Sequence, residues 1–64
     1  MAKTQQVLKM ISKDRIITVI RHHDDDYNPF WIYVKYDKHK TMMAKYADMT
    51  SCLYWIYEAT KPIG

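Results

Sequence analysis

The residues of this chain that could do chemistry are concentrated in one short polar stretch. Residues 22–26 read His-His-Asp-Asp-Asp, and imidazole and carboxylate groups are ligands that zinc and other divalent ions accept. Adjacent residues of a strand point to opposite faces, so His22 and His23 cannot both ligate from regular structure. No further cysteine or histidine stands at a spacing typical of metal sites. We therefore expect an acidic, solvent-exposed loop that holds neither a metal nor a cofactor.

Catalytic chemistry is not indicated either. An exposed carboxylate stays ionised at neutral pH unless burial or a neighbouring like charge raises its pKa, so the aspartates of this stretch are poorly suited to proton transfer. Cys52 is the only cysteine of the chain, and it falls on the apolar stripe of a predicted helix. A reactive thiol needs an exposed, electropositive site, so we expect Cys52 to be a small buried hydrophobe. The sequence predicts a protein that is not an enzyme.

Length and charge limit the remaining possibilities. The chain has 64 residues, which predicts one domain over residues 1–64. A domain of this size buries only about 60% of its unfolded surface and is marginally stable alone. One cysteine excludes a disulfide within the chain, so self-association is the simplest route to extra stability. The formal net charge of +3 and a pI near 9.1 also allow binding to a polyanion.

The sequence contains no membrane signal. No apolar run approaches the roughly 20 residues that span a bilayer, and the first residues lack the apolar core of a signal peptide. A lone cysteine is typical of a reducing compartment. We therefore expect a cytoplasmic protein that does not bind membranes.

Three segments are predicted to form an antiparallel sheet. Residues 15–22 are dense in β-branched side chains, and residues 30–36 and 40–46 alternate apolar and polar positions. The Asn28-Pro29 step places a loop before the second strand. Residues 4–12 are mostly good helix formers, which favours a short N-terminal helix, and a fourth strand is the alternative.

The hairpin between residues 36 and 42 determines which side chains share a face. A two-residue turn at Lys38-His39 would pair Ile32 with Lys45 and place a charge on the apolar face. A three-residue loop over residues 38–40 avoids this charge, with His39 or Lys40 in the left-handed conformation. The resulting pairs are Tyr36 with Met42, Val34 with Ala44 and Ile32 with Tyr46. The opposite face then carries Trp31, Tyr33, Lys35, Met43 and Lys45.

A C-terminal helix is predicted to cover the sheet. Asp48 is a favourable N-cap, and Pro62 ends the helical pattern. An apolar stripe recurs at helical spacing through Met49, Cys52, Leu53, Ile56 and Thr60. The predicted fold is therefore α+β: a three-stranded antiparallel sheet packed by a C-terminal helix, with a short N-terminal helix or a fourth strand.

Exposed aromatic and basic side chains provide the functional hypotheses. The candidate binding residues are Trp31, Tyr33, Lys35, Lys45, Arg21 and Trp55. The leading hypothesis is a non-catalytic protein interaction module, a homo-oligomer or the partner of another protein, that uses these aromatic rings. The alternative is weak binding of single-stranded nucleic acid, with rings for stacking and cations for phosphates. The same face could instead be covered by the N-terminal segment.

Overall fold

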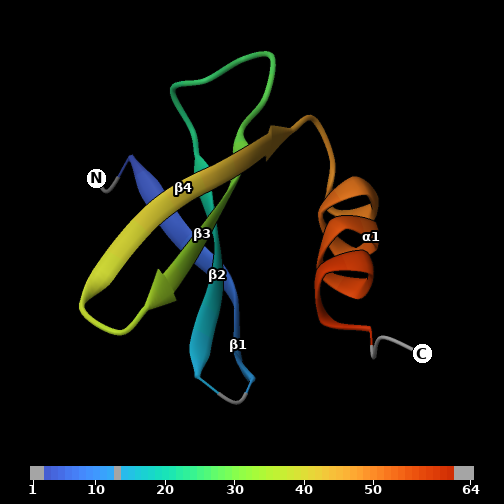
Figure 1. Ribbon diagram of the computed structural model, residues 1–64. Coiled ribbons are helices and arrows are strands. Elements are labelled where there is room, and N and C mark those ends of the chain that lie inside the picture. Colours follow the sequence, from blue (N-terminus) through green and yellow to red (C-terminus); the bar gives the residue numbers. More distant parts are fainter. Residues whose placement is uncertain (1–2, 13, 62–64) are drawn as a thin grey trace.

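The structure is a computed structural model that describes residues 3–12 and 14–61, and it has an α+β fold (Figure 1). Four antiparallel strands form one sheet in the order β1-β2-β3-β4, and one helix, α1, lies along one side of it. No helix in the described residues is long and apolar enough to cross a membrane. The elements are β1 (Thr4–Ser12), β2 (Arg15–His22), β3 (Phe30–Tyr36), β4 (His39–Tyr46) and α1 (Met49–Thr60).

The N-terminal segment is a strand, so the favoured helix over residues 4–12 is wrong and the alternative is right. β1 pairs with β2 along its length, from Thr4 opposite His22 to Ser12 opposite Arg15, and shifts register once, between Gln6 and Leu8. A helix of nine residues is marginal in water, whereas pairing supplies backbone hydrogen bonds along the whole segment. Leu8 and Met10 also pack against the core from this strand.

The hairpin between β3 and β4 differs from the predicted register. Tyr36 pairs with His39 across a tight turn in which Asp37 has a positive φ of 58°. Aspartate adopts this left-handed conformation more readily than most residues, which explains why Asp37 rather than His39 or Lys40 takes it. The register shifts between Ile32 and Tyr33, so Ile32 lies opposite Ala44.

This shift explains which predicted faces are right. On the side of the shift away from the turn, Ile32 faces the core. There Lys45 lies opposite Trp31 on the face of the sheet that points away from the core, as the sequence predicted. Nearer the turn, Met42 pairs with Tyr33 and joins that other face, contrary to the prediction. A one-residue change of register moves every following side chain to the opposite face. The turn introduces such a change in β4, and the irregularity opposite Ile32 and Tyr33 reverses it.

The core lies between the sheet and α1. Its buried residues come from β2, β3 and α1, and partly buried apolar side chains surround them. The buried set is Ile17, Val19, Ile32, Cys52 and Ile56. So small a core is consistent with a marginally stable chain.

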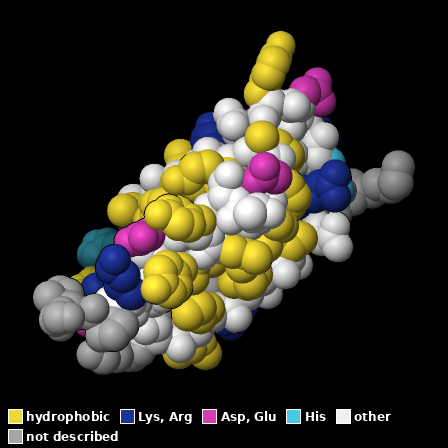
Figure 2. Space-filling model, turned by 90° about the vertical axis from the view of Figure 1, so that its right-hand side faces the viewer, with side chains coloured by type: hydrophobic (Ala, Val, Ile, Leu, Met, Phe, Trp, Pro, Cys, Tyr) yellow, Lys and Arg dark blue, Asp and Glu magenta, His cyan; other side chains and the backbone are white. Residues whose placement is uncertain are grey.

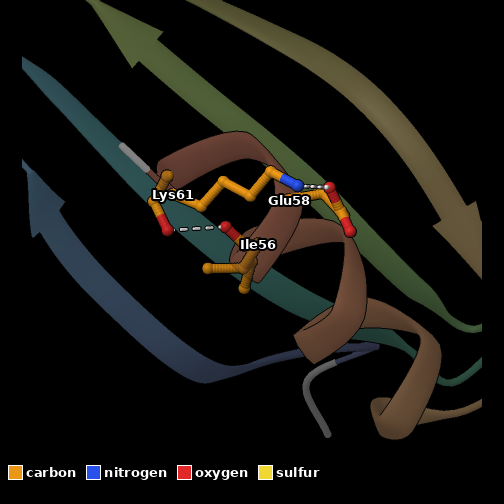
Figure 3. Close-up of polar contacts among 4 residues, drawn as sticks. Ile56, Glu58 and Lys61 are labelled. Atoms are coloured by element: carbon orange, nitrogen blue, oxygen red, sulfur yellow. Dashed lines mark hydrogen bonds and ion pairs between the residues drawn. The ribbon is translucent and has the colours of Figure 1, made fainter. Parts of the chain in front are cut away.

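Helix α1 is capped at both ends. The Asp48 carboxylate accepts a hydrogen bond from the backbone N–H of Ser51 at 2.9 Å, which lowers the pKa of Asp48. At the other end the backbone N–H of Lys61 donates to the Tyr57 carbonyl at 2.9 Å. The Lys61 ammonium lies 3.2 Å from the Glu58 carboxylate, on the exposed side of the last turn (Figure 3).

The predicted apolar stripe of the helix is only partly right. Cys52 and Ile56 are buried against the sheet, with Met49 and Trp55 packed beside them. Leu53, which the sequence placed in the stripe, is 50% exposed. Leu53 and Trp55 flank the buried pair on opposite sides of the helix, and of these two only Trp55 packs against the core.

Candidate functional site

The face of the sheet opposite α1, here called the outer face, carries the densest group of cationic and aromatic side chains. Its side chains form rows that cross all four strands. The row nearest the β2–β3 loop is Gln6, Ile20, Trp31 and Lys45. The next is Lys9, Thr18, Tyr33 and Met42, and the last is Ile11, Ile16, Lys35 and Lys40. The structure thus brings together four predicted binding residues: Trp31, Tyr33, Lys35 and Lys45.

The other two predicted binding residues lie elsewhere. Arg21 pairs with Phe30 in the sheet, and its guanidinium carbon lies 5.6 Å from the centroid of the Phe30 ring. Because Phe30 packs against the core, this position belongs to the α1 side. Trp55 is partly buried on α1 and also packs against the core. Arg21 and Trp55 therefore do not share a surface with Trp31 and Tyr33.

Trp31 is held on both faces of its ring. The His22 ring stacks on it with centroids 3.6 Å apart and an angle of 25° between the planes. The Lys45 ammonium lies 4.0 Å from the Trp31 centroid, and steric exclusion by His22 places it over the opposite face. The indole N–H donates to the Asn28 carbonyl at 2.8 Å and to the Asp25 carboxylate at 3.3 Å. This ring is therefore already occupied and is not an open platform for stacking a base.

Tyr33 holds a second lysine over the outer face. The Lys40 ammonium lies 4.9 Å from the Tyr33 ring centroid, a favourable cation–π distance. The Tyr33 hydroxyl lies 3.1 Å from the His22 Nε2, and burial raises the pKa of Tyr33, so the phenol remains neutral. The aromatic residues of this face thus position lysine side chains.

The polar stretch at residues 22–26 organises the β2–β3 loop. The Asp25 carboxylate accepts hydrogen bonds from the backbone N–H groups of Asn28 at 2.9 Å and Tyr27 at 3.1 Å. The bond from Asn28, then those from Tyr27 and Trp31, lowers the pKa of Asp25. A shallow depression of about 380 Å³ beside this loop is lined by His22, Asp24, Asp25, Asp26, Tyr27 and Trp31.

This loop offers no metal centre. Within residues 3–12 and 14–61, no group of three or more His, Cys, Asp or Glu residues is placed to hold a metal ion. Both Asp25 oxygens are already hydrogen-bonded to backbone and indole N–H groups. The hydrogen bonds of Asp25 close the loop and attach it to Trp31.

A basic groove runs across the middle of the outer face. Its volume is about 420 Å³, and no acidic residue lines it. The lining residues are Gln6, Lys9, Ile16, Thr18, Ile20, Tyr33, Lys35, Lys38 and Lys40. The sequence interpretation missed Lys9, Lys38 and Lys40, because it favoured a helix over residues 4–12 and a loop over residues 38–40. If residues 4–12 are taken as a strand, whose side chains alternate between the two faces of a sheet, Lys9 falls on the same face as Val7 and Ile11.

Cys52 lies in the core and has no contact with solvent. Burial raises the pKa of the Cys52 thiol, and the negative charge of Asp48 adds to that effect. Such a thiol is protonated at neutral pH and inaccessible, so it packs as a hydrophobe, as the sequence predicted.

Three exposed apolar side chains lie together on α1. Leu53, Tyr54 and Tyr57 are 50%, 66% and 63% exposed. Tyr57 lies three residues after Tyr54 and four after Leu53, so its side chain neighbours both on the helix surface. Figure 2 shows the side of the molecule that carries α1, where hydrophobic side chains gather across the middle. We call these three residues the helix patch.

Comparison with known proteins gives no assignment. No family model matches the chain, and neither a curated protein nor an experimentally determined structure matches it.

Proposed function

We propose that the protein is a non-catalytic interaction module that self-associates through the helix patch. The observation that carries this proposal is the exposure of Leu53, Tyr54 and Tyr57 side by side on α1. Contiguous exposed apolar surface on a small protein commonly marks a contact with another protein. Tyrosine is also enriched among the residues that dominate binding energy.

A second copy of the chain is the partner that the patch suits best. In a two-fold symmetric dimer the same patch is used by both copies, so a self-complementary surface is sufficient. The patch contains no charged side chain, so burying it leaves no charge without a partner. Its nearest charges, Glu58 and Lys61, already form an ion pair. The small core of the described chain also leaves much stability to be gained from association.

This proposal moves the contact from where the sequence placed it. The sequence interpretation used Trp31, Tyr33 and Trp55, but these rings are partly buried and engaged within the chain. The exposed aromatic rings on α1 are instead Tyr54 and Tyr57. The cytoplasm remains the proposed location, because a single reduced cysteine suits a reducing compartment.

Sedimentation analysis across a range of concentrations tests the proposal. We expect a dimer at about 100 μM, where even a weak association is visible. Tyr54→Ser should shift the protein towards monomer, because it removes one of the two aromatic rings of the patch and the most exposed of its three side chains. Tyr27→Ser is the matched control, because Tyr27 is 85% exposed and lies on the β2–β3 loop. A monomer at the higher concentrations, or equal effects of the two substitutions, would contradict the proposal.

A further inference from the structure

We propose that the outer face binds the phosphate backbone of single-stranded nucleic acid in its basic groove. This inference is independent of the helix patch, which lies on the opposite side of the sheet. The groove has four lysines among its lining residues, Lys9, Lys35, Lys38 and Lys40, and no aspartate or glutamate.

The charge of this groove is not neutralised within the described chain. Among residues 3–12 and 14–61 the ion pairs are Arg15 with Asp14 and Lys61 with Glu58, and neither involves a groove lysine. The nearest acid along the chain, Asp37, lies in the same turn as Lys38 but does not line the groove. Although the whole chain carries a formal charge of only +3, four of its ten basic residues line this groove with no acid among the lining residues.

Two of these lysines repel each other, and a bound anion would remove that repulsion. Lys35 and Lys40 are direct partners across β3 and β4, and like charges directly opposite one another destabilise a sheet. Lys40 is further fixed by its position over the Tyr33 ring. An ammonium held in this way keeps donors available for phosphate oxygens. The repulsion between Lys35 and Lys40 therefore favours a ligand with closely spaced negative charges.

The shape of the face favours a single strand. A DNA duplex is stiff, with a persistence length of about 150 bp, so it cannot curve into a depression of about 420 Å³. An extended strand can instead lie along the concave groove, whose polar lining also includes Gln6 and Thr18. A planar membrane surface would leave the same groove unfilled.

Phosphate contacts, rather than base stacking, should supply the affinity. Both faces of Trp31 are covered by His22 and Lys45, and Lys40 lies over Tyr33. Binding should therefore depend little on sequence and strongly on salt. If the four groove lysines each neutralise one phosphate, log affinity falls with log salt at a slope of about −3, which is about 50-fold between about 50 and 200 mM salt.

Fluorescence anisotropy with a labelled oligothymidine of about 15 nucleotides tests this inference. The full chain should bind with the salt dependence given above. In Lys35→Gln/Lys40→Gln the slope should fall to about −1.4, which is about a 7-fold loss over the same salt range. The matched control, Arg15→Gln/Lys61→Gln, removes the same formal charge from cations already paired with acids and should keep the original slope.

Absence of binding at low salt would overturn the inference. So would a control variant whose slope of log affinity against log salt falls as much as that of Lys35→Gln/Lys40→Gln. Equal or tighter binding of a duplex of the same length would also overturn it. So would binding to vesicles of phosphatidylcholine and phosphatidylserine in equal parts without binding to the oligonucleotide. Circular dichroism should show both variants folded. Tyr54→Ser should still bind, which separates this surface from the helix patch.

Discussion

Truncation of two neighbouring helix residues tests how α1 is seated on the sheet. Ile56 is 5% exposed and Leu53 is 50% exposed, although both are aliphatic residues of the same size on the same helix. Ile56→Ala should cost about 2–5 kcal/mol, because it leaves a cavity between α1 and the sheet. Leu53→Ala removes three carbons worth about 0.8 kcal/mol each when fully buried, so half burial gives about 1 kcal/mol and no closed cavity.

Urea unfolding followed by circular dichroism measures this difference. A chain of 64 residues is expected to have a free energy of unfolding of about 3–10 kcal/mol, so Ile56→Ala removes a large fraction and Leu53→Ala a small one. With a denaturant slope of about 1 kcal/mol per molar, Leu53→Ala lowers the midpoint by about 1 M and Ile56→Ala by about 2 M or more. The protein should be dilute, near 1 μM, so that self-association adds little. Equal midpoint shifts would refute this seating of the helix and return Leu53 to the core.

Two further predictions concern Asp25 and Cys52. Because the pKa of Asp25 is lowered in the folded chain, its carboxylate stabilises the loop above the ordinary pKa of about 3.9, and this contribution is lost as pH falls through the lower folded value. In a Trp55→Phe background, Trp31 fluorescence should therefore change on acidification below about pH 4, and Asp25→Asn should reduce this change; an identical acid profile would contradict the assigned role. The Cys52 thiol should react with Ellman's reagent far more slowly in native buffer than in concentrated urea, because burial raises its pKa and blocks access; equal rates would contradict its place in the core.

Much of the secondary structure was predictable because its signals are local. β2 and β3 have the predicted bounds, and α1 begins directly after the predicted N-cap, Asp48. The β-branched run in β2, the Asn28-Pro29 step before β3 and the Asp48 cap each act within a few residues of the chain. Such signals do not depend on what the element later packs against.

The parts that were wrong depend on contacts between distant residues. Residues 4–12 form a strand because β2 is available to pair with them, and their own helix propensity does not contain that information. The β3–β4 register depends on Asp37 adopting a positive φ and on an irregularity between Ile32 and Tyr33. Together these two features restore the apolar face without the longer loop that the sequence suggested.

The candidate site was predicted only in part for the same reason. The alternation in β3 placed Trp31, Tyr33 and Lys35 on one face, and pairing with β4 added Lys45. Lys9, Lys38 and Lys40 join them only through the correct strand and register assignments. The orientation of Trp31 could not be predicted, since it depends on His22, Asp25 and Lys45 from three different segments.

The aromatic residues that first suggested a binding face therefore have a different physical role from the one the sequence implied. A single helix can cover only one face of the sheet, so the outer face must be stabilised without a second apolar layer. Trp31 and Tyr33 achieve this by contacts with His22 and with the ammonium groups of Lys45 and Lys40. The same contacts fix these cations in place, which lowers the conformational entropy that a ligand would otherwise have to remove on binding. The pair of Lys40 with Tyr33 therefore stabilises the exposed face and also positions one lysine of the proposed anion-binding groove.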